Sequence, residues 1–284
     1  MDPRTRPYRS VLYIPGSKPR ALEKARTLPV DAVIFDLEDA VSVEEKENAR
    51  GTLAEALATG GYGARVRIVR INGLDTQWGR ADAEAAAKMD CDAILLPKVS
   101  SPADLDALAE LTGDKPLWAM METPRGMLNA AAIAAHPKLQ GMVMGTNDLA
   151  KELQTRFRPD RLPMMAGLGL CLLAAKAEGK IIVDGVYNAF KDDEGLKVEC
   201  DQGRDMGFDG KTLIHPAQVD VTNTAFAPSD AEIDLARRQI APFEEVEASG
   251  QGVAVVDGKI VENLHVVTAR EILAKADAIA AISA

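Results

Sequence analysis

Acidic side chains follow directly on an apolar run early in the chain. The segment VIFDLEDAV, residues 33–41, sets apolar residues against Asp36, Glu38 and Asp39. An apolar run of this length is typical of a strand buried on both faces, so these acids lie where the strand ends. Carboxylates at such a place can bind a cation, hold its water molecules or cap the next helix.

Polar residues follow several other apolar runs in the same way. They are Arg70 and Asn72 after VRIVRI, Lys98 after AILLP, Glu122 at the end of LWAMME, and Asp148 after MVMG. If the runs are neighbouring parallel strands about 4.8 Å apart, their carboxyl ends bring these side chains together. This clustering predicts an active site.

Glu122 and Asp148 are the candidate metal ligands. Two carboxylates, with no His or Cys near them in the sequence, suit Mg²⁺ better than zinc, and Glu38 and Asp39 would hold water molecules of the ion. Each acid has an alternative role at a helix N-terminus. Asp148 in GTNDLAKEL could be an N-cap, whereas Glu122 in AMMETPRG precedes Thr123 and Pro124, which supply the cap and first helical position.

The basic residues and histidines also leave alternatives open. The planar fork of Arg70 suits bidentate binding of a substrate carboxylate, but Arg70 could instead neutralise the acids at the neighbouring strand ends. Lys98 could form a Schiff base, bind a phosphate or lie on the surface. His136 and His215 each precede a proline, and we expect packing or loop roles, with His215 the better candidate for a ligand contact.

The elements that must position these residues alternate along the chain. Eight apolar runs, VLYI, AVIFDL, VRIVRI, AILLP, LWAMME, MVMG, KIIVDGV and KTLIH, are separated by alanine-rich amphipathic stretches. Eight strand and helix units of about 30 residues each predict a (β/α)8 TIM barrel. A doubly wound open sheet is the alternative, but it usually has fewer strands and a GxGxxG first turn, which IPGSKPRAL lacks.

The last part of the chain breaks this rhythm. SDAEIDLARRQIAPFEEVEASG begins with Ser229 and Glu232 in capping-box spacing, and VAVVDGKIV reads as a hairpin with an Asp-Gly turn before a final helix. We therefore expect a barrel over residues 1–220 and a helix-hairpin-helix extension over 221–284. A lone hairpin is only marginally stable unless it packs on another surface. We expect the extension to cover a barrel mouth, that of a neighbouring subunit.

Composition excludes several classes of protein. The 284 residues are 47% hydrophobic with a formal net charge of −10, so no basic stripe offers itself to nucleic acid or an anionic membrane. No segment approaches the roughly 18 apolar residues of a membrane helix, and we expect a cytoplasmic protein. Cys91, Cys171 and Cys200 lack CxxC spacing and are expected to be buried thiols.

Seven motifs in order carry a resemblance to a known family. RSVLYIPGSKP, VIFDLEDAV, RING, LLPK, METPRG, GTNDLA and IHPAQV resemble the CitE-like branch of the HpcH/HpaI aldolase family. That branch includes citrate lyase β subunits, malyl-CoA and citramalyl-CoA lyases and malyl-CoA thioesterases. The match runs from about Arg9 to Val219 and resumes weakly in the hairpin.

The resemblance implies a set of functional residues. It implies a TIM barrel, Mg²⁺ on Glu122 and Asp148, and a substrate carboxylate held by Arg70 and by backbone amides near Gly145 and Thr146. It also implies a homotrimer or hexamer. The phosphates of coenzyme A (CoA) would need cations at the rim, where Ser17, Lys18 and Arg20 lie in sequence and Lys98 is expected nearby.

The reaction that the resemblance implies is Mg²⁺-dependent cleavage of a carbon–carbon bond. A 3-hydroxyacyl-CoA, such as malyl-, citramalyl- or citryl-CoA, would give an acyl-CoA and an α-keto acid. Family lyases end their hairpin in a GxxVDxP-like stretch whose aspartate acts in a neighbouring active site as acid or base, but GKIVENLHV has Glu262. Two alternatives therefore stand beside the lyase: a malyl-CoA-type thioester hydrolase, and a citrate lyase β subunit that is active only with its complex partners.

Overall fold

The computed structural model describes residues 6–248 and 252–283. Its contacts divide the chain into one compact unit of Tyr8–Phe226 and a second that holds the chain from Ala227 onward. From the sequence we expect this boundary after residue 220; in the structure the helix Val219–Phe226 stays with the first unit.

Eight parallel strands close into a barrel in sequence order. The strands are β1 (Ser10–Pro15), β2 (Ala32–Asp36), β3 (Val66–Arg70), β4 (Ala93–Leu96), β5 (Leu117–Met121), β6 (Leu139–Met144), β7 (Ile181–Asp184) and β8 (Gly210–Leu213). β8 pairs with β1 and closes the ring. The predicted (β/α)8 barrel is confirmed, and each of the eight apolar runs contributes one strand.

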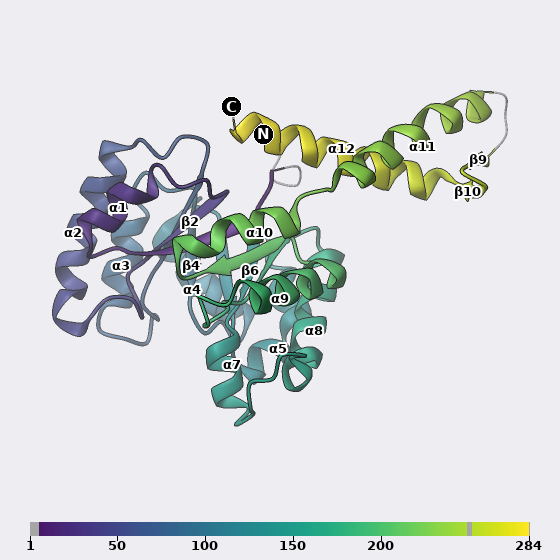
Figure 1. The fold of residues 1–284 in the computed structure, drawn as a ribbon. Helices are drawn as coiled ribbons and strands as arrows, with labels where there is room; N and C mark the ends of the chain where they lie inside the picture. The colour runs from purple at the N-terminus through teal and green to yellow at the C-terminus, as the bar shows by residue number, and fades with distance from the viewer. Residues whose placement is uncertain (1–5, 249–251, 284) are drawn as a thin grey trace. The chain divides into compact units, whose positions relative to one another are not determined.

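Helices connect successive strands and enclose the barrel (Figure 1). They are α1 (Pro19–Ala25), α2 (Lys46–Thr59), α3 (Gly79–Ala86), α4 (Pro102–Thr112), α5 (Pro124–Leu128), α6 (Ala130–Ala134), α7 (Thr146–Glu152), α8 (Met165–Ala177), α9 (Asp193–Met206) and α10 (Val219–Phe226). Short 3₁₀ turns lie at Val43–Glu45, Leu162–Met164 and Pro216–Gln218. Because helices cover one face of each strand and the barrel interior covers the other, the strands are apolar on both faces.

Strand residues alternate between two apolar clusters. Ile34, Ile68 and Met120 belong to the cluster that fills the barrel interior, whereas their neighbours Phe35 and Val69 pack in the larger cluster beneath the helices. Side chains two positions apart point to the same side of a strand. The next inward positions along these three strands are therefore two residues further on. In this sequence they are polar, and they lie together at the carboxyl end of the barrel.

That polar layer consists of Asp36, Arg70 and Glu122, two residues beyond Ile34, Ile68 and Met120 respectively. Register supports the placement, because Asp36 pairs with Arg70 across β2 and β3. The layer follows from strand alternation and parallel register, without any special loop geometry.

The second unit contains two helices and a hairpin. These are α11 (Asp230–Ala248), β9 (Ala254–Val256), β10 (Lys259–Val261) and α12 (Asn263–Ser283), so the expected helix-hairpin-helix extension is confirmed. The Ser229 hydroxyl accepts from the Glu232 N–H and donates to its carboxylate. The hairpin turns at Asp257 and Gly258, which both have positive φ, as a type I′ turn requires.

The hairpin has one buried and one exposed apolar face. Ala254 and Val261 pack on Phe243 and Val266. The next residues along the two strands, Val255 and Ile260, pair with each other, face away and are 68% and 65% exposed.

The three cysteines are free and buried in the barrel unit, as expected. Burial raises the pKa of Cys171 to about 12 and that of Cys200 to about 11. Within the described ranges, no helix is long and apolar enough to cross a membrane.

Gly141 provides a test of the barrel packing. A Cβ there would meet the Trp118 ring at 2.6 Å, whereas a Cβ at Gly169 in α8 would meet nothing within 4 Å. We expect Gly141→Ala to lower the free energy of unfolding by about 1–3 kcal/mol through overpacking. Gly169→Ala should raise it by about 0.5–1 kcal/mol, because alanine is the better helix former. Urea denaturation measures both, and an unchanged Gly141→Ala protein would contradict the packing.

Candidate active site

A cavity of about 290 Å³ opens at the carboxyl end of the barrel. We call it the barrel-mouth cavity. Its lining includes the polar layer together with residues from the following loops, among them Tyr13, Asp36, Asp39, Arg70, Glu122 and Asp148. Candidate residues from the ends of β2, β3, β5 and β6 thus meet in one space, together with Tyr13 of β1.

Asp36 and Arg70 form a bidentate ion pair at the floor of this cavity. Arg70 Nε donates to Asp36 Oδ1 at 2.7 Å, and Nη2 donates to Oδ2 at 2.6 Å. Asp36 also accepts the N–H groups of Glu38 and Ala40, each at 2.9 Å. Burial alone would raise the pKa of Asp36, but Arg70 and these two amides lower it below its usual value. Asp36 is therefore a carboxylate that fixes both Arg70 and the start of its own loop.

The third nitrogen of Arg70 faces the other two acids. Nη1 lies 2.9 Å from Glu38 Oε2, at ion-pair distance but outside hydrogen-bond geometry, and 3.4 Å from Asp39 Oδ2. The structure thus gives Arg70 the neutralising contacts that the sequence left as its alternative role. A substrate carboxylate that binds Nη1 must compete with Glu38 and Asp39.

Tyr13 covers the guanidinium. Its ring centroid lies 4.9 Å from Arg70 Cζ, and its hydroxyl donates to Met120 Sδ at 3.3 Å. Burial raises the pKa of Tyr13, so this phenol stays neutral in the range where enzymes work. The stacking holds the Arg70 plane from one side.

The carboxyl group of Glu38 has a strongly raised pKa. Burial raises the pKa of Glu38 to about 8; Arg70 opposes the shift, whereas Asp39, Glu122 and Asp36 add to it. Among the described residues, the carboxylates of Asp36, Glu38, Asp39 and Glu122 thus lie around the guanidinium of Arg70, and they carry excess negative charge when all four are ionised.

Glu122 extends from the end of β5. Its Oε1 accepts the Lys98 N–H at 2.8 Å, and Lys98 reaches this position with a left-handed φ of 53°. A Cβ at Gly145 would lie only 2.3 Å from Glu122 Oε2, so the glycine makes room for the carboxylate. Burial raises the pKa of Glu122 to about 7; the Lys98 amide and Arg70 oppose the shift, whereas Asp148 adds to it.

Asp148 lies in the first turn of α7. Gly145 is the N-cap of this helix, so Asp148 is not, and the capping alternative for Asp148 is excluded. Thr123 caps α5 by accepting the Gly126 N–H at 2.9 Å, and Pro124 follows at the first helical position, as predicted. Among the described residues, no hydrogen bond or ion pair engages the Asp148 carboxylate.

Glu122 and Asp148 fit a divalent cation. Both line the same cavity, one oxygen of Glu122 and both oxygens of Asp148 lack donors among the described residues, and burial together with the nearby Asp148 disfavours the ionised form of Glu122 when no cation is present. In the described part of the chain no three acids, cysteines or histidines form a metal cluster. An ion here would take its remaining ligands from water or substrate, as Mg²⁺ does in proteins.

The predicted substrate contacts lie around this pair of acids. The Gly145 N–H donates to Met121 O at 2.9 Å and is committed to the barrel, whereas Thr146 begins α7, where helix geometry provides no acceptor. Lys98 Nζ lies 3.8 Å from Glu38 Oε1. Burial would lower the pKa of Lys98, but the carboxylates, led by Glu38, raise it. A protonated amine is a poor Schiff-base nucleophile.

Two further predicted residues belong to other elements of the chain. Lys18 is exposed at the start of α1 and pairs with Glu45 at 2.9 Å. Glu262 follows β10 in the second unit, where its N–H donates to His265 Nδ1 and its C=O accepts from the first turn of α12.

The two candidate histidines have structural contacts, as expected. His136 lies 3.3 Å from Asp106, and its Nδ1 accepts the Lys138 N–H. His215 accepts the Ala217 N–H and stacks on Phe190.

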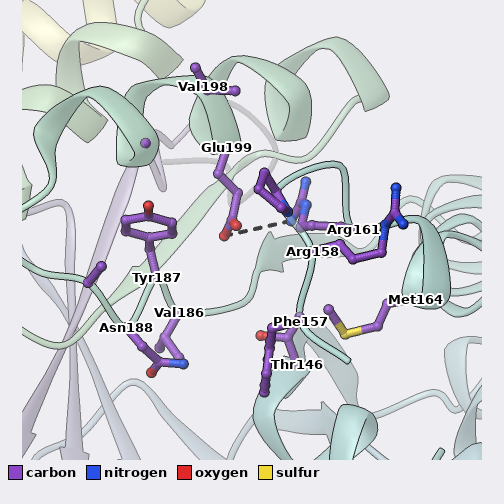
Figure 2. Close-up of a pocket in the computed structure, with 13 residues that line it drawn as sticks. Thr146, Phe157, Arg158, Arg161, Met164, Val186, Tyr187, Asn188, Val198 and Glu199 are labelled. Carbon is purple, nitrogen blue, oxygen red and sulfur yellow. Dashed lines mark ion pairs between the residues drawn. The ribbon is translucent and has the colours of Figure 1, made fainter. Parts of the chain in front are cut away.

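A second cavity, of about 540 Å³, shares Thr146 and Val186 with the first (Figure 2). We call it the side cavity. Arg161 and Glu199 line it. Behind them, Arg161 pairs with the buried Asp184 at 2.6 Å, and Lys211 Nζ donates to Glu199 at 2.6 Å. Figure 2 shows Arg161 turned toward Glu199, whose carboxylate lies 4.0 Å away. This ion-pair group fixes the loop before α8 against β7, β8 and α9.

Sequence reasoning named Asp36 among the strand-end acids but gave it no specific role and missed its pairing with Arg70; it also missed Tyr13 and the side cavity. Strand alternation could have identified Tyr13 and Asp36, because they share the inward parity of Val11 and Ile34. The side cavity had no comparable signal, since Arg161 lies in a loop and meets Asp184 through tertiary contact alone.

Comparison with known proteins agrees with this architecture. A profile of the HpcH/HpaI aldolase/citrate lyase family matches residues 9–216. The chain is 72% identical over 278 residues to a (3S)-malyl-CoA thioesterase of Cereibacter sphaeroides, covering 98% of each protein. It is 34% identical to the citrate lyase subunit beta of Escherichia coli K12, covering 96% of this chain and 95% of that protein.

A solved structure shows the same fold. CitE of Mycobacterium tuberculosis, crystallised with magnesium, acetoacetate and coenzyme A, superposes with a TM-score of 0.80 at 30% identity. The match covers 96% of this chain and 99% of CitE.

The raised pKa of Glu122 predicts pH-dependent metal binding. With a pKa of about 7, Glu122 is mostly protonated at pH 6 and mostly ionised at pH 8, and a metal ion must displace that proton. We expect Mg²⁺ affinity to rise about tenfold between pH 6 and pH 8. Calorimetry in two buffers of different ionisation enthalpy measures both affinity and proton release. Glu122→Gln should abolish tight binding, and a wild-type affinity that is constant over this range would contradict the assignment.

Proposed function

The chain belongs to the HpcH/HpaI aldolase/citrate lyase family, and we propose that it hydrolyses a malyl-CoA-type thioester. The observation that carries this proposal is the 72% identity to (3S)-malyl-CoA thioesterase, which extends over 98% of both chains. Hydrolysis breaks the bond between the acyl carbon and sulfur, adds water oxygen to that carbon and returns a proton to the thiolate. The products are free CoA and a hydroxy acid.

Glu122 and Asp148 would hold Mg²⁺ in this enzyme. Their unpartnered oxygens in the barrel-mouth cavity support the assignment, as does the magnesium in the crystallised CitE of M. tuberculosis. When bound, the ion would supply positive charge to oxygens of the substrate. Glu38 and Asp39 would hold its water molecules.

Arg70 would bind the substrate carboxylate through Nη1. Asp36 occupies the opposite edge of the guanidinium and Tyr13 covers its face, so the direction of Nη1 is fixed before substrate arrives. With a pKa of about 8, Glu38 can take a proton and yield its place beside Nη1. The Thr146 amide, at the start of α7, would add a donor to the same carboxylate.

Cations at the rim would receive the phosphates of CoA. Lys18 and Lys98 are both more than half exposed, and each is held near an acid that phosphate can displace. Arg20 is exposed in α1. These three residues are the proposed contacts of the nucleotide end.

Glu262 would move a proton in a neighbouring subunit. It lies beside a hairpin whose outer face exposes Val255 and Ile260, and an exposed apolar face supports burial against another surface. We propose that the second unit covers the barrel mouth of a neighbouring copy in a homotrimer or hexamer. Glutamate, about 1.5 Å longer than aspartate from bond lengths, would then suit activation of water.

A carbon–carbon lyase is the second candidate. The 34% identity to citrate lyase subunit beta, over 96% of this chain, favours it. In that reaction the bond between C2 and C3 of the hydroxyacyl thioester breaks, and the products are an acyl-CoA and an α-keto acid. Action within a citrate lyase complex would require partner chains as well.

Product analysis distinguishes these reactions. We expect pure protein with Mg²⁺ and malyl-CoA to yield malate and free CoA as the main products by mass spectrometry, and citramalyl- and citryl-CoA to react more slowly. Glu122→Gln should abolish product formation. Acetyl-CoA and glyoxylate as the main products would favour the lyase, and no reaction of the pure chain with any CoA ester would favour a complex subunit.

Glu262 has a separate test. If it transfers a proton, Glu262→Ala should lower turnover by about 100-fold or more and leave Mg²⁺ binding unchanged. Glu271→Ala, at an exposed glutamate of the same helix region, should keep full activity. Glu262→Asp should raise carbon–carbon cleavage relative to hydrolysis if side-chain length directs water attack.

Subunit sharing predicts complementation. Mixed oligomers of Glu262→Ala and Glu122→Gln chains would contain some sites in which both residues are intact, so activity should return on mixing. Full activity of Glu262→Ala would remove this role and leave the hairpin as an assembly element.

A further inference from the structure

Lys46 is a buried lysine that the proposed reaction does not use. It begins α2 and is 7% exposed. Its Nζ donates to Glu38 O at 2.8 Å, Asn72 Oδ1 at 2.7 Å and Leu37 O at 3.3 Å. All three ammonium protons are therefore directed at uncharged oxygens, and two of these oxygens belong to the backbone of the acidic loop after β2.

Asn72 holds Lys46 in this position. Asn72 Nδ2 donates to Leu37 O at 2.8 Å and to Asp82 Oδ2 at 2.6 Å. Asp82 in turn forms an ion pair with Arg50 at 2.8 Å. A continuous set of polar contacts thus runs from α3 through the end of β3 to the loop after β2.

The acidic loop depends on these contacts for its backbone conformation. On one side its N–H groups at Glu38 and Ala40 bond to Asp36. On the other side its carbonyls at Leu37 and Glu38 bond to Lys46. Moving the loop would leave the buried ammonium group without two of its three acceptors, which costs more than the loss of a solvated hydrogen bond. Lys46 therefore restrains the direction in which Glu38 and Asp39 leave the backbone.

We propose that Lys46 is a positioning residue, which holds the loop of residues 37–40 so that Glu38 and Asp39 face Arg70 and the candidate metal site. The part of this inference that concerns the metal rests on the proposed function. The part that concerns the loop stands on the contacts alone.

Lys115 provides a matched control. Its Nζ donates to two backbone carbonyls, Met89 O at 2.9 Å and Cys91 O at 2.8 Å. Lys115 lies just before β5, at the amino end of the strand and thus at the opposite end of the barrel from the polar layer. Replacing each lysine by methionine removes the same chemistry from two different loops.

Hydrogen exchange of the metal-free protein is the first measurement. In Lys46→Met, the amides of residues 38–41 should exchange at least about tenfold faster than in the wild type, while those of residues 89–92 keep their rate. In Lys115→Met, the amides of residues 89–92 should exchange faster, while those of residues 38–41 keep their rate. Equal exchange of residues 38–41 in Lys46→Met and wild type would overturn the proposal, and so would acceleration of that segment by Lys115→Met.

Metal affinity is the second measurement, with Mn²⁺ as the probe and electron paramagnetic resonance as the readout. Lys46→Met should bind Mn²⁺ about tenfold more weakly, as expected when groups that orient a metal site are lost. Lys115→Met should bind Mn²⁺ as the wild type does. Unchanged affinity in Lys46→Met would restrict Lys46 to the loop and overturn its role at the metal site.

The two measurements separate failure of this inference from failure of the proposed function. If the wild type binds no Mn²⁺, the metal assignment is wrong, and hydrogen exchange still decides the loop. If Lys46→Met does not fold, Asn72→Ala replaces it, because this variant removes one partner of Lys46 and keeps the ammonium. It should speed exchange in residues 38–41, and unchanged exchange there would contradict the proposal.

Discussion

The bidentate pair of Asp36 and Arg70 is the interaction on which the candidate site depends. It joins the ends of β2 and β3 at a depth where neither charge is stable alone. Other groups of the site are arranged around it: Tyr13 stacks on the guanidinium, and the Glu38 N–H at the start of the acidic loop donates to the Asp36 carboxylate. The pair also determines which single nitrogen of Arg70 remains directed at the acids.

Charge balance then explains why the site suits a cation. One guanidinium is set among four acids, and burial holds the pKa of two of them, Glu38 and Glu122, near neutrality. This excess of negative charge would attract a divalent cation, and the bound cation would neutralise it. The fold thus concentrates carboxylates at one end of the barrel, and the helices that pack around the barrel keep these charges in place.

Much of the fold and part of the site could be predicted from the sequence. Eight apolar runs gave the barrel, and the position of Glu122 before Thr123 and Pro124 separated a strand-end acid from a helix cap. The partner of Arg70 could not be predicted, because Asp36 meets it through cross-strand register, which no local pattern encodes. The side cavity could not be predicted from the sequence either, since Arg161 and Asp184 are 23 residues apart and meet through a loop.

The buried thiols have a practical consequence for labelling. Cys91, Cys171 and Cys200 are at most 5% exposed, and burial raises the pKa of each, so little reactive thiolate exists at neutral pH. A maleimide or a nitroxide reagent would leave the native chain unmodified. One cysteine introduced on the hairpin and one on the barrel rim would then be the only labelled positions, and spectroscopic distances between them could follow the two units during turnover without first removing any natural cysteine.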